Sequence, residues 1–144
     1  MKKGGIMAVG LKVKFFWYQI GTGDFLHSFF STIAYNLEDG KWGTRYPVLM
    51  KELYGGILKE NHLKVAKDEL EKITKELKKT PVSKVIWDID DLSKTMPWGD
   101  NISPDITDLS NYFITSDGED LITIIHHAID KAMELKSDII IESI

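Results

Sequence analysis

The sequence predicts an α+β fold in one domain, with a small mixed or antiparallel sheet of about four strands packed with about three or four helices. Two observations predict this fold. Apolar and polar residues alternate in several short stretches, and apolar residues recur every three or four positions in longer ones. The chain has 144 residues, 43% of them hydrophobic, which is enough to bury one ordinary core. We expect the domain to span residues 8–144, with residues 1–7 as a flexible N-terminal extension.

A strand and a central helix are predicted first. Residues 9–20 alternate along a single strand that places Trp17 among the core-facing side chains. Asp24 can then cap a helix over residues 25–38. The apolar arc of this helix is too wide for a surface helix, so we expect it to lie at the centre of the fold.

Two more helices are predicted after a loop that contains glycine. Pro47 suits the first turn of a short helix that ends near Gly55 and Gly56. Residues 62–79 carry one narrow apolar stripe and oppositely charged pairs four positions apart. This pattern is typical of an amphipathic helix at the surface.

A second strand is predicted over residues 82–90, with Trp87 facing the core and Asp88 and Asp90 facing solvent. Residues 91–104 are expected to form a loop, and a third strand is expected within residues 107–115.

The C-terminal part predicts a helix and a last strand. Ser116 and Glu119 match a capping box ahead of a helix over residues 118–136. The apolar run over residues 139–141 begins a final strand. The predicted order of elements is therefore β-α-α-α-β-β-α-β.

Negative charge concentrates in residues 82–120, which we call the acidic segment. It holds nine carboxylates and two lysines, whereas residues 1–81 carry fourteen basic and nine acidic side chains. Such a segment repels nucleic acid and attracts cationic partners. The pI of about 5.5 also argues against a nucleic-acid-binding protein.

Two tryptophans occur in loops beside glycine, Trp42 in Gly40-Lys41-Trp42-Gly43 and Trp98 in Pro97-Trp98-Gly99. Tryptophan is enriched at the energetic centres of protein interfaces, so both are candidate partner contacts. The alternative is that each indole folds back as a lid on the core. Six aspartates of the acidic segment are candidates for the same partner-binding surface: Asp88, Asp90, Asp91, Asp100, Asp105 and Asp108. The alternative is that they only form a solvated acidic face.

The sequence carries no catalytic motif, and we expect no enzyme activity, no cofactor and no metal. Cysteine is absent, which excludes disulfides and thiolate catalysis. His126 and His127 are adjacent, so on a helix they diverge by about 100° and cannot chelate one ion. Asp88-Ile89-Asp90 has the D-x-D spacing of some cation sites, but the motif is too short to be informative. His27 is expected to be a hydrogen-bonded core or boundary residue.

Apolar runs in the chain fall well short of the roughly 20 residues that span a bilayer. Zero cysteine fits a reducing compartment. We therefore expect no membrane partner.

Several short motifs occur in a characteristic order. Phe-Phe-Trp-Tyr-Gln runs into Gly-Thr-Gly-Asp-Phe, and Lys-Trp-Gly-Thr-Arg-Tyr-Pro, Ile-Trp-Asp-Ile, Pro-Trp-Gly and Leu-Ser-Asn-Tyr-Phe-Ile-Thr-Ser-Asp-Gly follow. Over about residues 8–142 this order resembles immunity protein 70, a family of small bacterial proteins of polymorphic toxin systems. The resemblance implies a cytoplasmic α+β protein, encoded beside a toxin gene, that neutralises the toxin by binding it. It supplies no catalytic residues, because immunity proteins act by occlusion.

The leading hypothesis is thus an immunity protein whose acidic face covers the active site of a cognate toxin. A nuclease is one candidate toxin, because its basic substrate groove would suit an acidic inhibitor. Two alternatives stay open. A small carboxylate-dependent hydrolase would need two convergent carboxyl groups in a pocket, and a homo-oligomeric regulatory or scaffold domain would associate through its own apolar patches.

Overall fold

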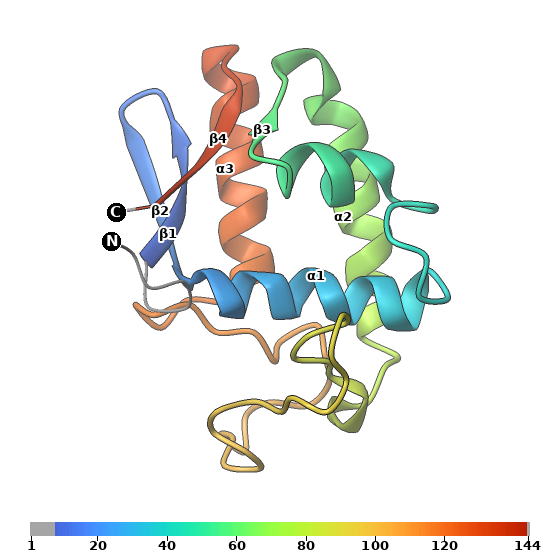
Figure 1. Ribbon diagram of the computed structural model, residues 1–144. Coiled ribbons are helices and arrows are strands. Elements are labelled where there is room, and N and C mark those ends of the chain that lie inside the picture. Colours follow the sequence, from blue (N-terminus) through green and yellow to red (C-terminus); the bar gives the residue numbers. More distant parts are fainter. Residues whose placement is uncertain (1–7, 144) are drawn as a thin grey trace.

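The computed structural model describes residues 8–143, and over these residues the chain folds into a four-stranded antiparallel sheet and a set of helices (Figure 1). This confirms the α+β fold class. The predicted N-terminal extension, residues 1–7, lies outside the described residues. The elements are β1 (Ala8–Val13), β2 (Phe16–Thr22), α1 (Gly23–Leu37), the π-helix η2 (Val48–Leu53), β3 (Ile57–Leu58), the 3-10 helix η3 (Glu60–His62), α2 (Leu63–Leu77), the 3-10 helix η4 (Val82–Lys84), α3 (Leu121–Leu135) and β4 (Ile139–Ser143).

The sheet has the strand order β2-β1-β4-β3, and each neighbouring pair is antiparallel. The single strand predicted over residues 9–20 is wrong, because the chain reverses and β1 and β2 form a hairpin. Lys14 lies in the turn between the two strands and has a positive φ of 53°. The turn contains no glycine, proline or asparagine, the residues that usually mark a turn in a sequence. At this hairpin Phe15 is 96% exposed and Trp17 is 37% exposed. The prediction that Trp17 belongs to the core is therefore wrong.

Helix α1 lies at the centre of the molecule, as predicted. It runs between the sheet, α2 and α3 on one side and the long loops of the acidic segment on the other (Figure 1). Its N-cap is Thr22 and not Asp24, since the Thr22 hydroxyl accepts the Phe25 N–H at 3.1 Å. The predicted apolar arc is buried, with Phe29, Ile33 and other members at or below 8% exposure.

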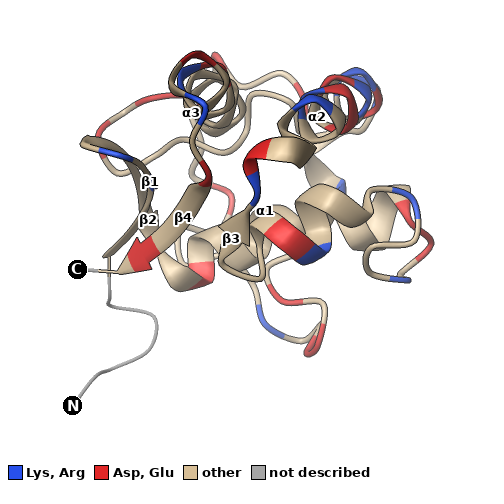
Figure 2. Ribbon diagram, turned by 90° about the horizontal axis from the view of Figure 1, so that it is seen from above, with Lys and Arg blue, Asp and Glu red and all other residues tan. Residues whose placement is uncertain are grey.

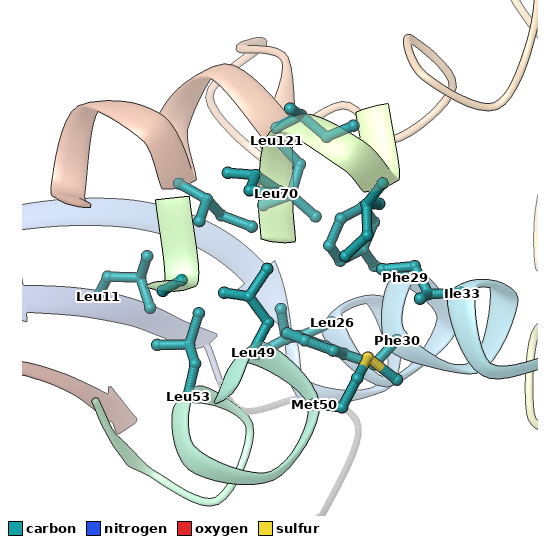
Figure 3. Packing of buried hydrophobic residues seen from close by; sticks show 14 of the residues in the cluster. Leu11, Leu26, Phe29, Phe30, Ile33, Leu49, Met50, Leu53, Leu70 and Leu121 are labelled. Atoms are coloured by element: carbon teal, nitrogen blue, oxygen red, sulfur yellow. The ribbon is translucent and has the colours of Figure 1, made fainter. Parts of the chain in front are cut away.

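The core gathers side chains from the sheet and the helices. Figure 3 shows residues of β1, α1, η2, α2 and α3 pointing toward one another. The labelled members are all buried: Leu11, Leu26, Phe29, Phe30, Ile33, Leu49, Met50, Leu53, Leu70 and Leu121. Their burial supplies the main driving force for the fold.

The two helices predicted between residues 47 and 79 are present. Pro47 precedes η2, and α2 turns its apolar stripe inward against η2 and α3. Acidic and basic residues both occur along α2 (Figure 2). None of the described helices is long and apolar enough to cross a membrane.

The strand predicted over residues 82–90 is wrong, and its backbone hydrogen bonds explain why. Buried polar side chains of α1 occupy the groups that a neighbouring strand would pair with. Thr32 Oγ1 accepts the Ile86 N–H at 3.0 Å and donates to the Ile86 carbonyl at 3.1 Å, and Ser28 donates to the same carbonyl at 2.6 Å. Ser31 Oγ accepts the Ile89 N–H at 3.2 Å. After η4, the segment therefore runs along α1 and joins no strand of the sheet.

The strand predicted within residues 107–115 is also wrong, because only an isolated bridge joins Ile114 to Asp120 there. Helix α3 starts at Leu121, and the predicted capping box is replaced by Asp120, whose side chain accepts the Thr123 N–H at 3.1 Å. The final strand is confirmed as β4, which pairs with both β1 and β3.

Candidate functional site

Trp98 projects from the outer loops of the acidic segment and is held in a fixed orientation. It is 37% exposed. Its indole N–H donates to the Tyr112 hydroxyl at 2.7 Å, and its ring meets the Trp87 ring edge to face at 5.6 Å and 88°. Trp87 is half-buried and packs against the core, in agreement with the prediction that it faces the core. Trp98 thus combines an exposed apolar surface with little remaining rotational freedom.

An open apolar cavity of about 270 Å³ lies beside Trp98, and we call it the Trp98 pocket. It is lined by Phe25, Trp98, Asn101, Ile102, Ser103, Ile106, Tyr112 and Ile114. A second cavity, of about 380 Å³, shares Ile102 and Tyr112 with it and is bordered by Asp100. Burial raises the pKa of the Tyr112 hydroxyl, which the Trp98 N–H already uses as an acceptor. The pair of cavities suits apolar side chains with a cationic neighbour.

Two of the predicted aspartates converge on His27, which extends from α1. Asp88 Oδ1 lies 3.8 Å from His27 Nδ1, and Asp90 Oδ2 lies 3.9 Å from His27 Nε2. We call these three residues the His27 cluster. The Asp88 side chain is only 21% exposed, so the prediction that it faces solvent is wrong, whereas Asp90 is 85% exposed as predicted.

The other aspartates serve the local turns of the acidic segment. Asp91 accepts hydrogen bonds from the Ser93 hydroxyl and N–H, which hold the pKa of its carboxyl below the ordinary value. Asp108 is partly buried, which raises the pKa of its carboxyl, but hydrogen bonds from Ser110 and Thr107 outweigh this and leave it lowered. Asp105 is exposed beside them.

Trp42 stacks on the ring of His27 and is half-buried against the core. Its indole N–H donates to the Met50 carbonyl at 2.8 Å, and its ring stacks on His27 at 5.8 Å and 21°. The buried carboxylate of Glu38 shapes this loop by accepting backbone N–H groups from Gly43 and Tyr46, among others. Trp42 therefore packs as the lid that the sequence offered as its alternative role.

Five of the eight predicted residues fall into two groups, and Asp91, Asp105 and Asp108 belong to neither. Asp88, Asp90 and Trp42 surround His27, and Trp98 and Asp100 border the two cavities. Sequence reasoning missed the convergence of the Asp-Ile-Asp motif on His27. It also missed Tyr112, which fixes Trp98.

The hydrolase alternative asks for two carboxyl groups that converge in a pocket. A cavity of about 360 Å³ is lined by two, Asp68 and Glu69. These are neighbours on α2 and so diverge by about 100°. Burial raises the pKa of Glu69, but both of its oxygens accept backbone N–H groups, from Val48 and Leu49, at the start of η2. This carboxylate has a structural task, so the cavity does not support hydrolysis.

Comparison with known proteins finds one family. Residues 11–141 match immunity protein 70. No curated protein and no solved structure gives a significant match. Because the matched residues cover most of the chain, it belongs to the immunity protein 70 family, and membership of this family implies an immunity protein of a toxin system.

Proposed function

We propose that this chain neutralises a bacterial toxin by direct binding, and that the surface formed by the acidic segment covers the active site of the toxin domain. The protein acts in the cytoplasm and makes or breaks no covalent bond in this role. Family membership supports a toxin as the partner. The choice of surface is carried by one observation, which is the exposed Trp98 beside an open apolar cavity within the most acidic part of the chain.

Trp98 acts in this proposal as the apolar anchor. Residues that dominate binding energy lie in well-packed pockets and are enriched in tryptophan. The hydrogen bond to Tyr112 and the contact with Trp87 fix the ring before binding, so little side-chain entropy is lost when a partner covers it. The Trp98 pocket then receives an apolar side chain of the toxin.

The aspartates supply attraction and orientation. Asp88, Asp90, Asp91, Asp100, Asp105 and Asp108 give the surface a negative potential that speeds the approach of a basic partner. Exposed members also form charge-assisted hydrogen bonds with lysine or arginine of the toxin. A nuclease fits as the toxin, because its substrate groove is basic.

The substitution Trp98→Ala tests the anchor. We expect it to weaken binding of the toxin domain by about 2 kcal/mol or more, which is roughly 30-fold in Kd. The cause is the loss of the exposed ring and the enlargement of its pocket. Titration calorimetry with the purified toxin domain measures the change, and circular dichroism checks that the variant keeps its fold.

Trp17→Ala is the matched control. Trp17 is also 37% exposed, and its indole N–H also donates to a side chain, that of Gln19 at 2.9 Å. It lies on the hairpin, away from the acidic segment in the sequence. We expect its affinity to stay within about twofold of the wild-type value. A loss in Trp17→Ala with unchanged binding in Trp98→Ala would reject the proposed surface in favour of the hairpin.

A further inference from the structure

Three side chains that can bind metal ions meet where α1 contacts the acidic segment. His27 comes from α1, and Asp88 and Asp90 come from a distant part of the sequence. One potential ligand atom from each residue lies within 4.8 Å of the others. Metal–nitrogen and metal–oxygen bonds of about 2.0–2.2 Å require ligand atoms of one ion to lie within roughly 4.4 Å. The Asp90 side chain is 85% exposed, so solvent leaves it room to turn toward an ion.

The backbone that carries the two aspartates is clamped to α1 on both sides of Asp88. Ile86 is bonded through its N–H and its carbonyl to Thr32, and the Ile89 N–H is bonded to Ser31. Asp88 Oδ1 also accepts the Asp90 N–H at 2.9 Å, which sets the relative position of the two carboxylates. The donors are therefore positioned before any ligand arrives, which lowers the cost of binding one.

The His27 ring is also held in place. Trp42 stacks on one face of the ring, and the centre of the Tyr54 ring lies 5.8 Å from the centre of the His27 ring. Ser31 Oγ lies 3.4 Å from His27 Nδ1. Only 24% of the His27 side chain is exposed. Contacts of this kind fix the orientation of a metal-binding imidazole in known sites.

The local charge favours a cation. Asp88 and Asp90 both approach His27, so two carboxylates meet at this place. Lys94 lies 3.7 Å from Asp88 Oδ2, and this leaves Asp88 Oδ1 facing His27. One lysine does not neutralise both carboxylates.

We propose that His27, Asp88 and Asp90 bind one divalent transition-metal ion, of which Zn²⁺ has the best-matched chemistry. One imidazole nitrogen and two carboxylate oxygens suit Zn²⁺ and its neighbours in the first transition row, whereas Ca²⁺ prefers six or more oxygen atoms. The ion joins α1 to the acidic segment. This site goes beyond the proposed toxin binding, and its test requires no toxin.

Titration calorimetry of the tag-free protein with ZnCl₂ alone tests the site. We expect one ion per chain, saturating at or below about 100 μM Zn²⁺, and a rise in the unfolding temperature, since a ligand that binds only the folded chain stabilises it. CaCl₂ at the same concentration should give neither effect. Absence of one-to-one Zn²⁺ binding by the wild-type protein would overturn the proposal and leave the cluster as an ion pair.

Three variants locate the ion. Asp90→Asn is the main one, because this exposed side chain can be changed without disturbing the core, and we expect at least about a tenfold loss of Zn²⁺ affinity. His27→Gln should give a similar loss. His62→Gln is the control, since His62 also faces a carboxylate, Glu52 at 2.7 Å, but only one. Affinity that survives both Asp90→Asn and His27→Gln would place the ion elsewhere and refute the assignment.

Discussion

Arg45, the one arginine of the chain, joins three parts of the fold. Its guanidinium donates to both oxygens of Glu76 on α2, at 3.0 and 2.6 Å, and to the Leu37 carbonyl at the end of α1 at 2.7 Å. Tyr46 also donates its hydroxyl to Glu76. The hydrogen bond from Arg45 holds the pKa of Glu76 below its usual value, and partial burial opposes this.

This lowered pKa predicts how stability depends on pH. As the pH falls, the unfolded chain takes up a proton at this position first, so the contribution of Glu76 is complete above about pH 4.5 and is lost as the pH passes through the lower folded-state pKa. At pH 7 we expect Glu76→Gln to lower the free energy of unfolding by about 1 kcal/mol, a small value because solvent screens a partly exposed pair. The difference from wild type should shrink toward about pH 3.

Urea unfolding at several pH values measures this difference. Glu71→Gln on the exposed side of the same helix is the control and should change stability little at any pH. A gap between Glu76→Gln and wild type that stays constant down to pH 3 would show that the ion pair is not its source.

The elements that the sequence predicted well are those with a long and regular apolar period. Helices α2 and α3 each bury one apolar stripe, and such a stripe can be recognised in the sequence without knowing which element it packs against. The strands predicted over residues 9–20 and 82–90 failed because alternation does not reveal a turn or a pairing partner. A signal for the second failure was present in α1, where Ser28, Thr32 and Asn36 occur four apart in an apolar helix. Buried polar groups require partners, and the backbone of residues 84–89 supplies them.

Thr32→Val tests this attachment of the acidic segment to α1. Valine has the same shape but leaves the Ile86 N–H without the Thr32 hydroxyl, while the Ile86 carbonyl keeps the hydrogen bond from Ser28. We expect a loss of about 1–3 kcal/mol in the free energy of unfolding, because a polar group left unpaired away from water costs its desolvation. Urea unfolding followed by circular dichroism gives the value.

Thr74→Val provides the comparison for Thr32→Val. The Thr74 hydroxyl only donates back to the Leu70 carbonyl within α2. We expect a cost below about 1 kcal/mol there. Equal costs at both positions would mean that the Thr32 hydroxyl does not hold the acidic segment in place.

At the scale of the whole molecule, α1 runs between the sheet, α2 and α3 on one side and the loops of the acidic segment on the other (Figure 1), and Phe113 of the acidic segment packs against its ring residues. The sequence located the acidic segment and its exposed tryptophan, because charge and loop composition are readable along the chain. It could not show that Asp88 approaches His27 or that Tyr112 bonds to Trp98, since these contacts join residues far apart in the sequence. The lid position of Trp42 likewise depends on Met50 and His27.

Amide hydrogen exchange of this chain, with and without a cognate toxin domain, tests the central claim most directly. Much of residues 86–114 has no helix or strand, so many of its amides should exchange quickly in the free protein and report contact clearly. We predict that binding slows exchange mainly within residues 86–114. Slowing confined to the β1–β2 hairpin or to the charged side of α2, with residues 86–114 unchanged, would contradict the account.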